Sequence, residues 1–334
     1  MLVSSIDIEE FRGIVRCKTP LALSKFTVLV GRNNSGKSSV LEALSLLPMY
    51  SFRPPYIDDS RIDFVARLHA GKSSLVYGYS GGAMIKYKIQ DKTWTIRIKD
   101  EGLDHQDIEG VEESNLLNNP ALALAKIFDI DHRKDKLYDE VNNLVFFIPN
   151  DSYFMDRLHS KLRDEKYRNM VIKMGANTRV AELINKCVDD RYTEVLFTPE
   201  FSARKERGSG KSPLYIKVKD LGDGVQKAVL RALWLEAINP SLVLWDDFEG
   251  SAHPTLIKLL LEWLSKKSWQ VIISTHSIDV LTSLLEVRPK DSKVIQLKKT
   301  NDDVLLHEDL TLEELENVIE TSQDPRRLVD SLKL

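Results

Sequence analysis

The pattern of hydrophobic and polar residues changes along the chain. Residues 3–30 and 74–98 contain short apolar or alternating runs, which are typical of strands. We expect three strands in the first region and an antiparallel layer in the second, where 86–89 and 94–98 alternate. From about residue 224 onward, amphipathic stretches take turns with short apolar runs. Such alternation predicts a parallel sheet and an α/β fold.

The middle of the chain favours helices. Helical spacing dominates over 113–128 and 152–187, with a buried strand expected at 144–148 and a strand pair near 194–218. The later alternation predicts a helix from about 224, a strand at 242–245, a helix at 255–266, a strand at 270–274, a helix at 277–286 and a strand at 293–298.

One loop matches a phosphate-binding motif in full. Residues 31–38 read G-x-x-x-x-G-K-[ST] and lie between an apolar strand at 26–30 and a helix at 39–47. Glycine permits backbone angles that let successive N–H groups point at phosphate oxygens, and the helix N-terminus adds positive potential. The predicted nucleotide-binding residues here are Gly31, Asn33, Asn34, Ser35, Gly36, Lys37, Ser38 and Ser39.

Two residues of this loop have predicted roles in chemistry. Lys37 is expected to bridge the β- and γ-phosphates of ATP, and the Ser38 hydroxyl is expected to bind Mg²⁺. The alternative is a glycine-rich turn with a chance lysine. Strand, loop and helix together favour the nucleotide site over that alternative.

Similar short sequences elsewhere lack this context. Residues 207–212 contain G-K-S without the upstream glycine and continue into a strand, so we expect a mobile turn. Residues 71–74 also lack the upstream glycine. Residues 80–82 lie between strand-like runs at 75–79 and 84–89, which predicts a hairpin turn.

Two further apolar strands end in polar residues. The strand at 242–245 is followed by Asp246, expected to hold the Mg²⁺ shell, and Asp247, expected to orient the attacking water. The strand at 271–274 is followed by Thr275, His276 and Ser277, where the histidine can hydrogen-bond the γ-phosphate or the water. The alternatives are a solvated strand terminus and a helix-capping cluster with a bystander histidine.

These motifs resemble those of ATP-binding-cassette ATPases. Residues 31–38 look like the Walker A motif, 246–254 like the D-E-P-E-x-x-x-H-P Walker B and D-loop, and 274–277 like the T-H-S switch. The resemblance is greatest to the overcoming-lysogenisation-defect (OLD)-like branch, related to RecF and to the heads of structural-maintenance-of-chromosomes (SMC) proteins. Residues 6–13 are similar to the opening strand of that group, and 220–227 to its signature motif.

The resemblance implies a fold and an assembly. It implies a P-loop NTPase of the cassette-ATPase head type, with a mixed or parallel core sheet, an antiparallel β layer and a helical lobe. In that family two heads sandwich two ATP molecules, and the signature loop of one head faces the Walker A loop of the other. Arg12, Gly222 and Gly224 would then also contact the nucleotide.

The implied domain is a single one that spans residues 1–334. We expect a nucleotide-binding lobe from about 1–100 and 240–300, a helical lobe carrying the signature from about 105–238, and a C-terminal helical tail at about 308–334. Two residues depart from the family pattern: Gly222 replaces the signature serine and Asp247 replaces the usual catalytic glutamate. Slow hydrolysis is therefore expected.

Composition narrows the class further. Of the 334 residues, 43% are apolar, and the net charge is -3. This charge excludes a uniformly basic surface that would bind nucleic acid. A basic cluster at 204–207 with Lys211 leaves DNA binding open. Two cysteines, Cys17 and Cys187, fit a reducing compartment. The sequence shows neither a membrane-span pattern nor a secretion signal, which predicts a cytoplasmic protein.

The leading functional hypothesis is an ATP-gated homodimeric clamp ATPase in DNA maintenance or in defence against mobile elements. OLD proteins continue into a Toprim nuclease domain, and residues 278–334 are too few for one, so we expect a separate effector protein. One alternative is a nucleotide sensor or scaffold that does not hydrolyse ATP. A transporter ATPase subunit is a weaker alternative, because residues 220–227 lack the Ser-Gly-Gly-Gln core.

Overall fold

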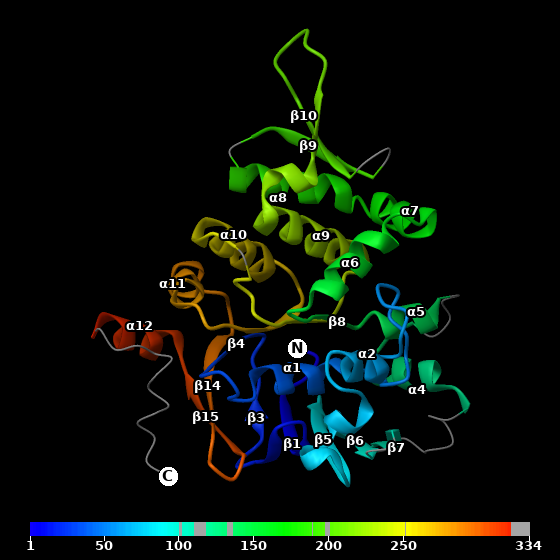
Figure 1. The fold of residues 1–334 in the computed structure, drawn as a ribbon, viewed down its shortest axis with the longest axis vertical. Helices are drawn as coiled ribbons and strands as arrows, with labels where there is room; N and C mark the ends of the chain where they lie inside the picture. The colour runs from blue at the N-terminus through cyan, green and yellow to red at the C-terminus, as the bar shows by residue number, and fades with distance from the viewer. Residues whose placement is uncertain are drawn as a thin grey trace.

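The computed structural model describes most of the chain. The described residues are 1–99, 102–109, 118–131, 136–188, 190–197, 201–250 and 252–321. Within them, the chain forms a large sheet covered by helices, with a smaller sheet at the far end of the helical region (Figure 1).

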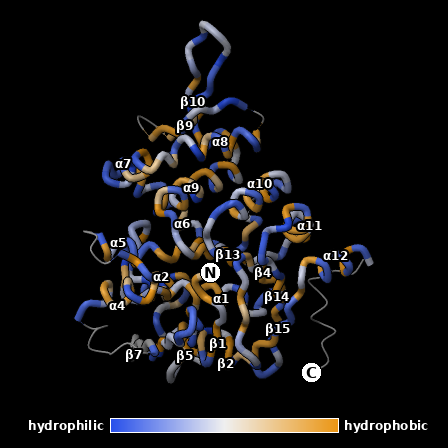
Figure 2. The backbone as a smooth tube through the Cα atoms, turned by 180° about the vertical axis from the view of Figure 1, so that it is seen from behind, coloured by the Kyte–Doolittle hydropathy of each residue, from blue (hydrophilic) through white to orange (hydrophobic). Residues whose placement is uncertain are grey.

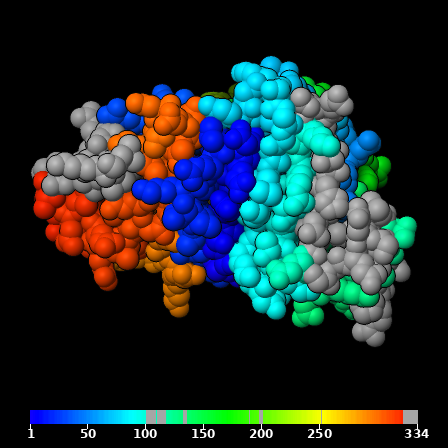
Figure 3. All heavy atoms as spheres, turned by 90° about the horizontal axis from the view of Figure 1, so that it is seen from below, coloured from blue at the N-terminus to red at the C-terminus, as the bar shows by residue number. Residues whose placement is uncertain are grey.

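The large sheet is mixed and twelve-stranded, in the order β7-β6-β5-β1-β2-β15-β14-β4-β13-β12-β8, with β3 paired to β1. Its strands are β1 (Ser5–Phe11), β2 (Ile14–Cys17), β3 (Leu21–Ala22), β4 (Phe26–Val30), β5 (Gly82–Ile89), β6 (Lys92–Lys99), β7 (Gly102–Ile108), β8 (Val145–Ile148), β12 (Leu242–Trp245), β13 (Gln270–Ser274), β14 (Ser292–Lys299) and β15 (Val304–Leu310). Seen from below, the N-terminal strands lie between β14–β15 and β5–β6, as this order requires (Figure 3).

One half of the large sheet is parallel. Strands β14, β4, β13, β12 and β8 run in the same direction, and every residue of β4, β8, β12 and β13 is buried. Continuous apolar runs are expected there, because helices cover both faces of a parallel sheet. The carboxyl ends of these strands therefore lie at one edge, and the residues that follow them meet there.

The other half is mostly antiparallel, as the sequence predicts, although β2 pairs with β15 in parallel. Strand β1 pairs with β5, β5 with β6, and β6 with β7. Two predictions for the N-terminal part are wrong. Residues 3–30 form four strands and not three. Residues 75–79 do not form a strand, and the hairpin at 80–82 is absent from the described structure. Two short 3₁₀ turns, η1 (Lys72–Leu75) and η2 (Tyr77–Tyr79), take its place. The left-handed backbone of Gly78 (φ 65°) is incompatible with a regular strand.

Helices surround the parallel half and extend beyond it (Figure 1). They are α1 (Lys37–Ser45), α2 (Arg61–Arg67), α4 (Pro120–Ile127), α5 (Leu137–Asn142), α6 (Ser152–Lys161), α7 (Glu165–Lys173), α8 (Ala176–Val188), η3 (Val218–Leu221), α9 (Asp223–Ile238), α10 (Pro254–Ser265), α11 (Ile278–Val287) and α12 (Leu312–Glu320). Part of the helical region predicted at 113–128 lies outside the described residues.

The small sheet lies at the tip of the helical region. It comprises β9 (Tyr192–Leu196), β10 (Ser202–Lys205) and β11 (Leu214–Lys217), so the predicted strand pair is a three-stranded antiparallel sheet. Hydrophobic segments concentrate in the large sheet and on the inner helices, whereas the connection between β10 and β11 is hydrophilic (Figure 2).

Candidate nucleotide-binding site

The phosphate loop joins β4 to α1, as predicted. Gly31 has φ 151°, and a Cβ atom there would lie 2.4 Å from the carbonyl oxygen of Leu297. Gly36 caps α1 with φ 99° and offers no side-chain hydrogen bond to the helix. The first N–H groups of a helix have no partner within it, so those of α1 face the loop and suit an anion.

The Lys37 side chain folds back over this loop. Its Nζ atom donates hydrogen bonds to the carbonyl oxygens of Gly31 (3.0 Å) and Arg32 (3.1 Å). Burial lowers the pKa of Lys37 to about 8, and the negative charges of Asp246 and Glu249 oppose that shift. The ammonium group therefore lies where the phosphate loop and the carboxyl ends of the neighbouring strands meet.

Asp246 follows β12 and faces the start of α1. The hydroxyl of Ser274 donates a hydrogen bond to its carboxylate. Burial raises the pKa of Asp246, while hydrogen bonds with Ser274 and Ser38 oppose the shift. A hydroxyl oxygen and a carboxylate oxygen thus converge at Ser38 and Asp246. This is the oxygen donor set that Mg²⁺ prefers in nucleotide sites.

Asp247 lies at the same edge in a left-handed conformation, with φ 50°. Its backbone N–H donates to Ser274 Oγ (2.9 Å), and Asn150 Nδ2 donates to its Oδ2 atom (2.8 Å). Burial raises the pKa of Asp247, and the charges of Glu249 and Asp246 add to that effect. A carboxyl group with a raised pKa is better suited to accept a proton near neutral pH.

Asn150 was not among the sequence candidates. It follows β8, which pairs with β12 in parallel so that Ile148 lies opposite Trp245. The two strands therefore end level with each other, and their next polar residues meet. A polar residue two positions after a buried strand was the available signal, but the sequence did not reveal that β8 neighbours β12.

Glu249 connects two segments of the site. Its carboxylate accepts hydrogen bonds from the Thr275 hydroxyl (2.8 Å) and the His276 backbone N–H (2.7 Å). Burial and the nearby charge of Lys37 lower the pKa of His276, so its imidazole is neutral at pH 7. Glu249 therefore holds the backbone that carries His276 beside the phosphate loop.

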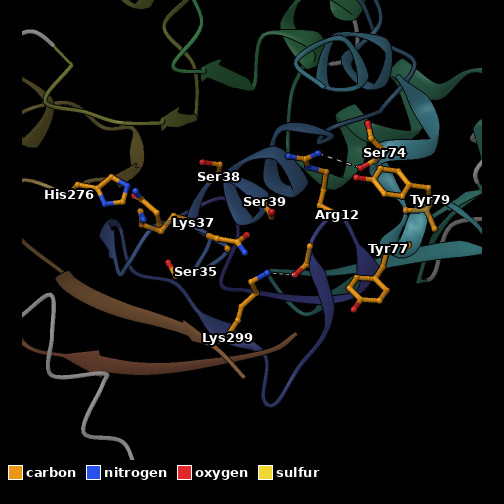
Figure 4. Close-up of a pocket in the computed structure, with 16 residues that line it drawn as sticks. Arg12, Ser35, Lys37, Ser38, Ser39, Ser74, Tyr77, Tyr79, His276 and Lys299 are labelled. Atoms are coloured by element: carbon orange, nitrogen blue, oxygen red, sulfur yellow. Dashed lines mark hydrogen bonds between the residues drawn. The ribbon is translucent and has the colours of Figure 1, made fainter. Parts of the chain in front are cut away.

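The phosphate loop and His276 line a pocket of about 680 Å³ (Figure 4), and neither Asp246 nor Asp247 is among the described residues that line it. The predicted residues that line it are Arg12, Asn33, Asn34, Ser35, Gly36, Lys37, Ser38, Ser39 and His276. Ser35 Oγ is buried and has no hydrogen-bond partner within the part of the chain that the structure describes. An unpartnered buried hydroxyl and the free N–H groups of the helix start together suit phosphate oxygens.

Arg12 lies in the middle of this pocket (Figure 4). Its Nε atom donates to Glu42 of α1 (2.8 Å), and one terminal nitrogen donates to the Ser74 carbonyl (3.4 Å). His69 contacts the other oxygen of Glu42 (2.8 Å). The Arg12 guanidinium is thus fixed relative to the phosphate-loop helix, and its contact with a nucleotide stays a prediction.

The predicted signature glycines lie elsewhere. Gly222 is exposed with φ 92° and precedes α9, and a Cβ atom there would meet nothing within 4 Å. Neither Gly222 nor Gly224 is among the described residues that line the 680 Å³ pocket. Asp247 lines a second pocket of about 450 Å³ together with Asp223 of α9. A single chain therefore does not bring the signature glycines to its own phosphate loop.

Family comparison agrees with this geometry. The family described as "AAA ATPase domain" matches residues 1–173, more than half of the chain. The chain belongs to the AAA ATPase domain family. A second family, described as "AAA domain, putative AbiEii toxin, Type IV TA system", matches residues 94–283. This AAA ATPase domain is accordingly a nucleotide-binding P-loop ATPase, a family whose members bind ATP, usually with Mg²⁺.

Individual relatives match most of the length of this chain. An "ATP/GTP phosphatase" of Helicobacter pylori is 23% identical over 343 residues, which cover 87% of this chain and 90% of that protein. The SMC head bound to the C-winged helix domain of ScpA has a TM-score of 0.60 at 16% identity, covering 95% of this chain and 100% of that one. The SMC head domain of Thermotoga maritima has a TM-score of 0.53 at 14% identity, covering 93% and 100%.

Structural similarity at these identities shows the fold, which is the P-loop NTPase fold of SMC heads, as expected from the motifs. The described helices include none that is long and apolar enough to cross a bilayer.

Proposed function

We propose that this ATPase works as a homodimer in which ATP binds between the phosphate loop of one chain and the start of α9 of the other. The observation that carries the proposal is the position of the signature glycines. Gly222 precedes the 16-residue helix α9, which has no side-chain cap, and it is exposed and does not line the pocket at the phosphate loop of its own chain. The N–H groups at a helix start without a side-chain cap suit an anion, and the Asp223 carboxylate in the first turn of α9 is paired with Lys227 (2.7 Å). A second chain would bring this helix start to the γ-phosphate.

Binding of ATP would use the phosphate loop. The Lys37 ammonium would exchange its contacts with loop carbonyls for the β- and γ-phosphate oxygens, and the N–H groups at the start of α1 would hold the same phosphates. Ser38 and Asp246 would hold Mg²⁺, whose charge would neutralise the phosphate oxygens.

Hydrolysis would depend on the residues that follow β12 and β13. Asp247 would accept a proton from the attacking water, Asn150 would orient its carboxylate, and neutral His276 would hydrogen-bond the water or the γ-phosphate. Aspartate is one methylene shorter than glutamate, so its carboxylate reaches less far toward the water. We therefore expect slow turnover.

For the cellular process, we propose DNA maintenance or defence against mobile elements, with a separate effector protein. The motif resemblance to OLD-like ATPases and the SMC-head fold support it. The second family description, which names a toxin of a toxin–antitoxin system, also supports it. One similar head domain is described as bound to a domain of another protein, ScpA, which is the kind of assembly that we propose.

A nucleotide sensor that does not hydrolyse ATP is the second candidate. Two observations favour it: Gly222 lacks the hydroxyl of a signature serine, and one oxygen of the Asp247 carboxylate already accepts a hydrogen bond from the Asn150 amide. Turnover distinguishes the candidates. A steady-state ATPase rate that is abolished by Lys37→Ala supports the enzyme, and ATP binding without turnover supports the sensor.

Sedimentation velocity tests the homodimer. The Asp247→Asn variant should retain ATP and form a dimer with Mg-ATP but not without nucleotide. Adding Gly224→Glu should abolish that dimer and leave ATP binding intact, because a glutamate in the first turn of α9 suits the helix but repels the γ-phosphate. Gly208→Glu is the matched control, since a Cβ atom there would meet nothing within 4 Å. A monomeric Asp247→Asn variant at micromolar concentration with Mg-ATP would contradict the proposal.

A further inference from the structure

The phosphate loop lines one end of the 680 Å³ pocket, and aromatic residues line the other end. Lys37 and His276 lie at one end, Arg12 lies in the middle, and Tyr77 and Tyr79 lie at the other (Figure 4). The whole space measures about 680 Å³, which is in the range of sites that enclose an entire small-molecule ligand. A triphosphate at Lys37 would therefore leave room at the tyrosine end for the nucleoside.

The backbone of this end holds an aromatic ring away from the core. Gly78 and Tyr79 both have left-handed backbones, with φ 65° and 66°. This conformation is unfavourable for a residue as bulky as tyrosine, and such strain gathers at functional sites. The Tyr79 residue is 69% exposed, although it lines the pocket. Its ring is thus available to a ligand.

Tyr77 lines the same end of the pocket as Tyr79, and hydrogen bonds hold it in place. Its hydroxyl donates to Asp303 (3.0 Å), and Asp303 also accepts from Lys299 (2.8 Å). Lys299 in turn donates to the carbonyl of Gly13, in the turn next to Arg12 (2.7 Å). These bonds fix Tyr77 to the strands that line the lower side of the pocket, whereas the Tyr79 ring has open space.

We propose that Tyr79 stacks on the purine base of the bound nucleoside triphosphate, and that this site accepts ATP and GTP alike. The proposal rests on the proposed nucleotide function of the phosphate loop. Stacking on an aromatic ring tolerates any base, because every base has a π-face. Strong discrimination needs polar groups that hydrogen-bond the base edge.

Side chains at the tyrosine end are already engaged. The Ser74 hydroxyl donates to the Gly71 carbonyl, and the Tyr77 hydroxyl donates to Asp303. Val76 is apolar, and Gly78 has no side chain. Among the described residues that line this end, none presents an amide or carboxylate side chain to distinguish an adenine edge from a guanine edge. Shape and stacking therefore hold the base.

Calorimetric titration with Mg-ATP, Mg-GTP and Mg-tripolyphosphate tests the proposal. Removing one stacking ring costs at least about fivefold in affinity. Tyr79→Ala should therefore weaken ATP and GTP binding by at least about fivefold each and leave tripolyphosphate binding unchanged. Tyr79→Phe should bind all three as the wild type does. Tyr215→Ala is the matched control, because Tyr215 is 58% exposed on β11 of the small sheet and does not line the pocket.

Three results would overturn the proposal. These are a loss of less than fivefold for ATP in Tyr79→Ala, an equal loss for tripolyphosphate, and a wild-type preference between ATP and GTP above about tenfold. Failure of the phosphate site itself gives a different result. If Lys37→Ala binds all three probes as the wild type does, the proposed function fails, whereas a loss with Lys37→Ala beside an unaffected Tyr79→Ala refutes only the base contact.

Discussion

Nucleotide affinity should fall as pH rises through about 8, because the Lys37 ammonium loses its proton there. The amino group is buried against the carbonyls of Gly31 and Arg32, and burial lowers its pKa to about 8. Bound phosphates would favour the charged form and raise that pKa again. When a group has a higher pKa in the complex than in the free protein, the ligand binds most tightly at pH values below the pKa of the free protein.

The size of the effect follows from the pKa. With a free-protein pKa of about 8, Lys37 is about nine-tenths charged at pH 7 and about one-tenth charged at pH 9. If the complex keeps the proton throughout, the dissociation constant for Mg-ATP should rise about tenfold between these pH values. Isothermal titration calorimetry with excess Mg²⁺ measures this change directly, and it should also show proton uptake on binding near pH 9.

Lys37→Arg is the control, because a guanidinium stays charged throughout this range. Its Mg-ATP affinity, whatever its absolute value, should change less than about twofold between pH 7 and pH 9. A wild-type affinity that is flat across this range would refute the argument from the buried ammonium. An equal slope in Lys37→Arg would assign the titration to another group.

The remaining predictions concern residues around the loop. Gly31→Ala should lower the free energy of unfolding by about 1–3 kcal/mol, since its Cβ would meet the Leu297 carbonyl at 2.4 Å, and an unchanged denaturant midpoint would contradict this. Asp246→Asn should impair Mg²⁺-dependent ATP binding in calorimetry, whereas Asp247→Asn should bind normally and hydrolyse slowly; equal effects of the two changes would refute their separate roles. His276→Ala should keep ATP affinity and lose turnover in a phosphate-release assay, and a wild-type rate would remove the residue from the site.

The sequence predicts much of the fold because its strongest signals are local. The strand at 26–30, the loop at 31–38 and the following helix need only neighbouring residues to be recognised, and all three form as expected. The β-α alternation after residue 224 is equally local. Apolar runs such as 242–245 and 270–274 match buried strands to the residue.

What the sequence does not predict depends on distant contacts or on backbone strain. Asn150 reaches Asp247 only because β8 pairs with β12, and the two residues are 97 positions apart. Glu249 meets His276 for a similar reason, across the ends of two strands. The segment at 75–79 has the composition of a strand. The left-handed backbones of Gly78 and Tyr79 prevent a strand there, and residues of this segment line the pocket instead.

Mixing two inactive variants tests the shared ATP site most directly. Lys37→Ala removes the phosphate-loop cation and leaves the start of α9 intact, whereas Gly224→Glu does the reverse, so each should be inactive alone. In an equal mixture, half of the dimers would be mixed and carry one intact site, so the ATPase rate should recover to about a quarter of the wild-type rate. If the mixture shows only the summed background of the two variants, ATP is not shared between two chains and the account is contradicted.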